Sequence, residues 1–127
     1  MNRVVITGIG VVSSLGNNVE AVETSLRLGR SGIVNDLERS EMGFRSPLTG
    51  AINGFEAESI LSKKHRKTMP DFAVQAYSAS IEALEKSGLS TEDIKNDATG
   101  IIFGCDSSCI AYVEKVDLLR LYCETKS

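Results

Sequence analysis

The sequence holds few of the residues that bind metals or perform nucleophilic catalysis. Its 127 residues include one histidine, His65, and three cysteines, Cys105, Cys109 and Cys123. Because a structural zinc site needs four ligands at recognisable spacing, these residues predict no metal centre. The chain also enters an apolar run directly after Met1-Asn2-Arg3, without the pattern of a signal peptide. Together with the odd number of cysteines, this start predicts reduced thiols and a cytoplasmic protein.

Long apolar runs and an excess of positive charge are absent as well. No apolar run approaches the roughly 20 residues that a membrane-spanning helix requires, so we expect no membrane segment. The formal net charge is -3 at pH 7, and no overall basic field therefore favours nucleic acid as a partner. With 42% hydrophobic and 24% charged residues, the composition is that of an ordinary globular protein, and residues 1–127 suit a single domain.

The apolar stretch from Val4 to Gly16 predicts the element around which the remaining chain packs. The β-branched run Val4-Val5-Ile6 predicts a buried strand. Gly8 and Gly10 follow it and predict a bend, which requires either positive φ angles or the close approach of another backbone segment. A second apolar run, residues 99–104, predicts another buried strand that also ends at a glycine.

Two helices are predicted by capping residues and by the spacing of apolar side chains. Residues 18–28 follow a favourable N-cap, Asn17, and stop before Gly29. A longer helix is predicted to begin at Pro70-Asp71 and to end at Gly88, because proline suits a first helical turn and glycine a helix end. Both sequences place apolar residues at helical spacing, which indicates that each helix covers a sheet with one face.

The remaining segments predict shorter elements. Residues 30–62 indicate a surface excursion with a short strand near 49–53 and a helical turn near 56–62. Ser90 begins a single helical turn, and a last helix is predicted over about 110–123. The order of elements predicts an α/β layered fold with parallel strands. Only two buried strands are evident, so the chain would hold the opening of a larger sheet and leave apolar faces and backbone groups uncovered.

Gly8-Ile9-Gly10 could also begin a dinucleotide-binding loop, but the spacing argues against this function. The GxGxxG pattern needs a third glycine where this sequence has Ser13. The predicted helix also begins near Asn18, too late for its N-terminus to hold a pyrophosphate. A tight bend beneath packed elements is the favoured interpretation.

Cys109 is the cysteine best placed for nucleophilic chemistry, because the predicted helix start would lower its pKa. No histidine lies near it in the sequence, and a pair with His65 could form only through the fold. Ordinary thiols are therefore favoured for all three cysteines.

One dense basic run, Lys63-Lys64-His65-Arg66-Lys67, precedes the long helix. A solvated junction is the ordinary interpretation of such a run. The functional interpretation is a positive patch for an acidic partner, and the following helix N-terminus also favours anions. Because no aromatic residues are interleaved with the basic ones, nucleic acid is the less favoured partner.

Four segments carry a resemblance to one enzyme family: VVITGIGVVSSLGN at 4–17, LGRSGI at 28–33, residues 73–89 ending in EKSGL, and IIFGCDSS at 101–108. They resemble the N-terminal part of β-ketoacyl-[acyl carrier protein] synthases, the condensing enzymes of fatty-acid synthesis. The resemblance implies an α/β, thiolase-like fold and a homodimer when the enzyme is complete. This chain would then be the incomplete N-terminal portion of the first of two layered halves.

The resemblance implies a decarboxylating Claisen condensation that needs no cofactor. A cysteine at a strand-to-helix turn takes up an acyl group, and histidines assist the decarboxylation of malonyl-carrier protein. No cysteine of this chain resembles that nucleophile, and His65 resembles neither histidine. We therefore expect no catalytic residue in this chain and no condensing activity of the 127 residues alone. The alternatives are a non-catalytic remnant or carrier-protein interaction module, or part of a polyketide-type synthase.

The resemblance also implies partners and binding residues. Lys63, Lys64 and Lys67 fall where bacterial members dock the acidic acyl carrier protein, which delivers the acyl and malonyl thioesters. Ser107 falls on a turn that helps line the acyl pocket near the dimer interface. Many members are rich in glycine at this turn, whereas this chain has Cys105-Asp106-Ser107-Ser108. The resemblance therefore does not determine the size of the acyl pocket.

Overall fold

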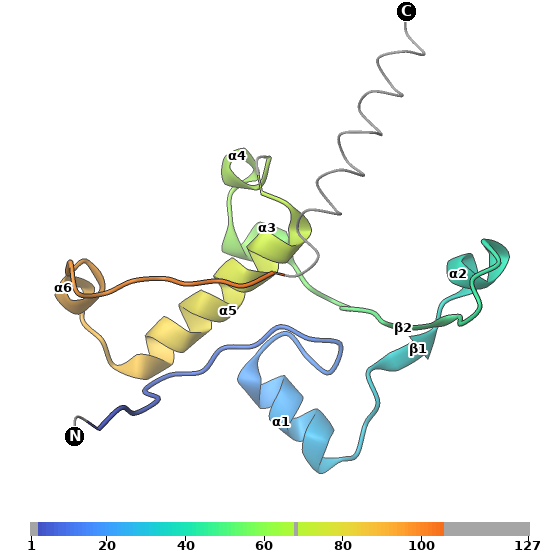
Figure 1. Ribbon diagram of the computed structural model, residues 1–127, viewed down its shortest axis with the longest axis horizontal. Coiled ribbons are helices and arrows are strands. Elements are labelled where there is room, and N and C mark those ends of the chain that lie inside the picture. The colour runs from blue at the N-terminus through green and yellow to red at the C-terminus, as the bar shows by residue number, and fades with distance from the viewer. Residues whose placement is uncertain (1–2, 68, 106–127) are drawn as a thin grey trace, which may run out of the picture. The chain divides into compact units, whose positions relative to one another are not determined.

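The computed structural model describes residues 3–67 and 69–105. The chain divides into two units, Met1–Thr91 and Glu92–Ser127, and α6 (Thr91–Ile94) begins at their boundary. The described residues form a mixed α/β fragment. In the first unit, Figure 1 labels α1 (Val19–Arg27), β1 (Ile33–Asn35), α2 (Leu37–Glu41), β2 (Leu48–Gly50), α3 (Ala57–Ile60), α4 (Lys63–Arg66) and α5 (Asp71–Ser87).

Helix α1 confirms the helix predicted over residues 18–28, with a different N-cap. The side chain of Asn18, not Asn17, accepts the N–H of Ala21 at 2.8 Å. Asn17 is engaged elsewhere, because its amide donates to the carbonyl of Asn53 at 2.9 Å. After the helix, Gly29 has a φ of 62°, the left-handed conformation that terminates many helices.

Helix α5, the longest element among the described residues, confirms the predicted helix between Pro70 and Gly88. Pro70 is its N-cap with extended backbone angles, and Gly88 ends it in the left-handed conformation with a φ of 73°. Val74 on this helix is 4% exposed and is the only large apolar residue classed as buried within 3–67 and 69–105. The core of the first unit therefore centres on α5.

The two strands form an antiparallel pair, whereas the parallel strands predicted at Val4–Ile6 and residues 99–104 are not formed in the described residues. Ile33 pairs with Gly50, Val34 with Thr49 and Asn35 with Leu48. A parallel pair needs a crossover that carries the chain back along the sheet, whereas residues 36–47 return it directly. The short strand predicted near 49–53 thus corresponds to β2, and the helical turn predicted near 56–62 corresponds to α3.

The buried strand predicted at Val4-Val5-Ile6 is wrong. These residues lie in no strand, and Val4 is 92% exposed. A strand exists only through hydrogen bonds to a neighbouring strand, and no described segment pairs with these residues. The residues keep the β-branched composition of a strand without a partner beside them.

The bend at Gly8 and Gly10 makes a close backbone contact with α5. A methyl group built on Gly8 would strike the carbonyl oxygen of Ala83, and one on Gly10 would strike that of Ala79. Neither glycine has a positive φ. Of the two explanations for these glycines, the close approach is confirmed and the positive φ is wrong.

In the second unit, α6 confirms the single helical turn predicted after Ser90. The strand predicted over residues 99–104 is wrong, since these residues pair with no described segment and Ile102 is 97% exposed. Thr99 instead closes a turn through its hydroxyl, which donates to the carbonyl of Asp93 at 2.6 Å. The helix predicted over 110–123 lies outside the described residues.

Large apolar side chains remain exposed in both units. They include Val4, Val5 and Ile6 in the first and Ile101, Ile102 and Phe103 in the second. The expected exposure of apolar faces is thereby confirmed, and its effect on stability remains a prediction. No helix in the described part of the chain is long and apolar enough to cross a membrane.

Candidate functional site

Three exposed lysines gather on and directly after the single turn α4. Ser62 precedes this turn with extended backbone angles, and the N–H of Lys67 donates to the carbonyl of Lys63 at its end. Lys63 and Lys67 stand four residues apart, a spacing that places side chains on one face of a helical turn. Lys63, Lys64 and Lys67 are exposed, and none of them forms an ion pair with another described residue. We call these three residues the lysine cluster.

Arg66 belongs to the same basic run but turns toward the protein. Its Nε donates to the carbonyl of Leu61 at 3.1 Å, and its Nη1 lies 2.9 Å from Oε1 of Glu58. The side chain of Arg66 is 24% exposed, whereas that of Glu58 is 74% exposed. Arg66 therefore ties α4 to α3 and does not present its charge as the lysines do.

A cavity of about 310 Å³ opens beside Arg66 and the start of α5. Its apolar lining includes Ile52, Phe55, Met69 and Val74, and its polar lining includes Arg66 and Asp71. The cavity thus adjoins the basic turn through Arg66.

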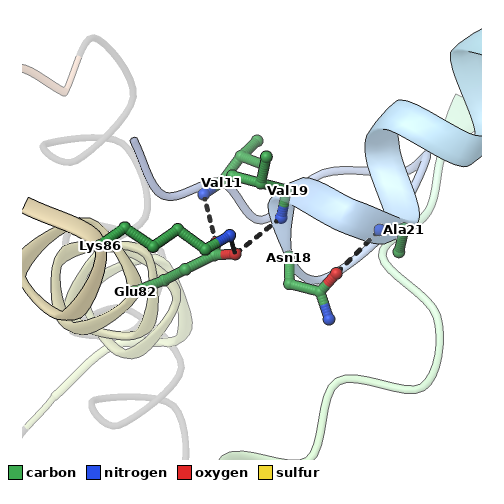
Figure 2. Close-up of polar contacts among 6 residues, drawn as sticks. All are labelled: Val11, Asn18, Val19, Ala21, Glu82 and Lys86. Atoms are coloured by element: carbon green, nitrogen blue, oxygen red, sulfur yellow. Dashed lines mark hydrogen bonds and ion pairs between the residues drawn. The ribbon is translucent and has the colours of Figure 1, made fainter. Parts of the chain in front are cut away.

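A second polar centre, at Glu82 on α5, holds the N-terminal segment and α1 (Figure 2). Its Oε2 accepts the N–H of Val11 at 3.1 Å, and its Oε1 accepts that of Val19 at 2.9 Å. Lys86 donates to the same Oε1 at 2.7 Å. Because Val19 is the first residue of α1, the carboxylate also faces the positive end of that helix.

The surroundings of Glu82 favour its ionised form. Burial acts to raise the pKa of this carboxyl group, but the ammonium of Lys86 and the two backbone N–H groups outweigh it and hold the pKa below its usual value. An ionised carboxylate with three donors is suited to holding structure, not to transferring protons. Sequence reasoning missed Glu82, since its partners at Val11 and Val19 are brought to it only by the fold.

Of the remaining predicted candidates, the structure describes His65 and Cys105. His65 lies on α4, with its Nδ1 3.3 Å from the hydroxyl of Ser62. Cys105 is exposed, whereas Ser107, Cys109 and Cys123 lie outside the described residues. Across residues 3–67 and 69–105, no three histidine, cysteine or acidic side chains form a group that could hold a metal ion.

The glycine bend does not form a phosphate-binding loop. Gly8 and Gly10 face the backbone of α5 at contact distance, so that side of the bend has no room for a ligand. This geometry supports the interpretation of a tight bend beneath packed elements over that of a nucleotide site.

Comparison with known proteins places the chain in one family. Residues 1–124 match the family described as "Beta-ketoacyl synthase, N-terminal domain". The chain is 43% identical over 104 residues to 3-oxoacyl-[acyl-carrier-protein] synthase 1 of Haemophilus influenzae, in an alignment that covers 82% of this chain and 25% of the relative. It is 35% identical over 112 residues to synthase 2 of Vibrio cholerae, covering 88% of this chain and 27% of that protein.

Synthase 1 of Escherichia coli K12 is 38% identical over 105 residues, which cover 82% of this chain and 26% of that protein. The chain thus spans about a quarter of the length of these relatives. The resemblance noted at residues 4–17 is confirmed. On the match over residues 1–124, the chain belongs to the β-ketoacyl synthase family and corresponds to part of its N-terminal domain.

Proposed function

We propose that the lysine cluster docks an acyl carrier protein onto a β-ketoacyl synthase of fatty-acid synthesis. The observation that carries this proposal is the exposure of Lys63, Lys64 and Lys67 on one turn, without ion pairs to described residues. Exposed charges of one sign attract a partner of the opposite sign and orient it as it approaches. The names of the relatives supply the partner, since they are synthases of 3-oxoacyl-[acyl-carrier-protein].

The reaction we propose for the complete synthase is a decarboxylating Claisen condensation. An acyl group passes to a cysteine thiolate, and malonyl-carrier protein loses carbon dioxide to give a carbanion. The carbanion attacks the acyl thioester and expels the cysteine thiolate. The product is a 3-oxoacyl group attached to the carrier protein. This chain contributes no catalytic residue in the proposal, because none of its cysteines resembles the nucleophile and His65 resembles neither histidine of the family.

The same proposal includes the architecture. Residues 1–127 would form the incomplete first portion of one thiolase-like synthase domain, in an enzyme that is a homodimer. Ser107 would line the acyl pocket near the dimer interface. The exposed apolar residues at Val4–Ile6 and Ile101–Phe103 support this architecture, since the further chain of a complete domain would cover them.

Charge reversal in the lysine cluster tests the docking proposal. In the intact protein, Lys64→Glu combined with Lys67→Glu should weaken the affinity for acyl carrier protein by at least about tenfold at low salt, because two attractive contacts become repulsive. The dependence of affinity on salt concentration should also become shallower. Binding can be measured by fluorescence anisotropy with labelled acyl carrier protein.

Lys95→Glu is the matched control, because Lys95 is an exposed lysine outside the cluster. It should change the affinity much less than the double reversal. Unchanged affinity after reversal of Lys64 and Lys67 would refute the docking assignment.

A second candidate function is carrier-protein binding without condensation. The observation that favours it is that the exposed lysine cluster lies within this chain, whereas no residue of the chain resembles a catalytic residue of the family. Both candidates predict the same effect of the lysine variants, and they differ in whether an acyl-enzyme forms on the protein.

A further inference from the structure

Helix α4 is too short to hold its own conformation. It contains four residues, and its N-cap Ser62 makes no capping hydrogen bond through its side chain. Isolated helices of this length do not persist in water, because nucleation costs more than the few hydrogen bonds return. Contacts with other elements must therefore hold this turn in place.

Arg66 supplies such contacts on the inner side of the turn. Its guanidinium donates to the carbonyl of Leu61, at the end of α3, and to the carboxylate of Glu58 within α3. Both partners precede α4 in the chain, so the two bonds close the corner between α3 and α4. A planar guanidinium can make both bonds at fixed angles, which a lysine ammonium cannot reproduce.

We infer that Arg66, held by Glu58 and Leu61, is a positioning residue that fixes the orientation of the lysine cluster. This inference rests on the proposed docking function. Arg66 stands between Lys64 and Lys67 in the sequence, so a rotation of the turn that freed Arg66 would also reorient the lysines. With the corner fixed, the lysines are already ordered before the partner arrives, and docking costs less conformational entropy.

Whether one substitution raises or lowers the affinity for the partner distinguishes a positioning role from an effect of net charge. Glu58 is an exposed negative charge beside the basic turn. If only the net charge mattered, Glu58→Gln would make the surface more positive and would strengthen the binding of an acidic partner. If Glu58 acts by holding Arg66, the same substitution weakens binding because the corner loosens.

Glu56→Gln is the matched control for this change of charge. Glu56 stands at the start of α3, is exposed, and makes no capping hydrogen bond through its side chain. Its substitution removes the same charge two residues away without touching Arg66. It should leave the affinity unchanged or raise it slightly.

The experiment measures binding of acyl carrier protein to the intact protein over a series of salt concentrations. We expect Glu58→Gln and Arg66→Lys each to weaken binding by about 3- to 10-fold, the cost of ordering one or two side chains on docking. The salt dependence should keep its slope, because all three lysines still contact the partner. The double variant should bind no more weakly than Arg66→Lys alone, since both changes break one interaction.

Each outcome of this experiment decides the inference. Tighter binding by Glu58→Gln, or an effect equal to that of Glu56→Gln, overturns the positioning role while the lysine variants still test docking. A shallower salt dependence in Arg66→Lys or Glu58→Gln also overturns it, because the pair would then contact the partner directly. If reversal of Lys64 and Lys67 has no effect, the docking function itself fails.

Discussion

Replacing Glu82 by glutamine should loosen the N-terminal segment and the start of α1 together. The carboxylate accepts two backbone N–H groups, from Val11 and Val19, and the ammonium of Lys86. Its side chain is 17% exposed, so water replaces these bonds only in part. Glutamine keeps one acceptor oxygen and puts an N–H₂ group where the second oxygen was. At least one of the two backbone N–H groups then loses its acceptor.

The size of the effect follows from the loss of one bond to a charged group. A partly buried donor left without an acceptor costs about 1–3 kcal/mol. The local opening that exposes the amides of Val11 and Val19 should therefore become roughly 5- to 150-fold more frequent. Amide hydrogen exchange followed by NMR measures this opening at each residue, and it does not require a fully cooperative unfolding transition.

Glu85→Gln is the control, because Glu85 is an exposed glutamate on the same helix, and neither of these N–H groups donates to it. It should leave the exchange rates of Val11 and Val19 unchanged. Equal protection of both amides in the wild type and in Glu82→Gln would refute the role assigned to Glu82.

The same carboxylate predicts a dependence of stability on pH. Its pKa in the folded protein lies below the usual glutamate value. Its contribution to stability is therefore complete above the pKa of an unfolded glutamate, and it is lost as the pH falls through the lower, folded pKa. The wild type and Glu82→Gln should thus differ most near neutral pH and converge in acid, as urea unfolding midpoints would show.

Two further predictions concern the glycine bend and the chemistry. Gly10→Ala would push a methyl group into the carbonyl of Ala79, and we expect a destabilisation of about 1–3 kcal/mol by urea unfolding. Gly100→Ala, at a position with open space, should have a small effect, and similar losses for both would contradict the packing explanation. The 127 residues alone should form no acyl-enzyme with labelled acyl-carrier protein, because they lack the implied catalytic residues. A stoichiometric burst of protein-bound label would contradict this expectation.

Local signals predicted α1 and α5, whereas a strand at Val4–Ile6 depended on a partner that no local signal reveals. Gly29 and Gly88 terminate α1 and α5 as the sequence indicates, because a left-handed residue at a helix end is a local preference. Val4–Ile6 has the composition of a strand, but strand formation needs hydrogen bonds from a neighbouring segment. The described residues provide none, so β propensity alone gave the wrong assignment.

The candidate site was predictable in its charge and not in its orientation. The basic run singled out Lys63, Lys64 and Lys67, and the structure leaves all three exposed. The inward turn of Arg66 could not be predicted, because Glu58 and Leu61 reach it only through the corner between two short helices.

The contact between the glycine bend and α5 also determines the register of the N-terminal segment. Gly10 meets Ala79, and Gly8 meets Ala83 one helical turn later. Two residues of extended chain advance about 6.6 Å, and four residues of helix advance about 6 Å, so the two repeats match. A slip by one residue would bring the side chain of Ile9 to a position that only glycine fits. The segment therefore has a unique alignment along α5, although no strand pairs with it in the described chain.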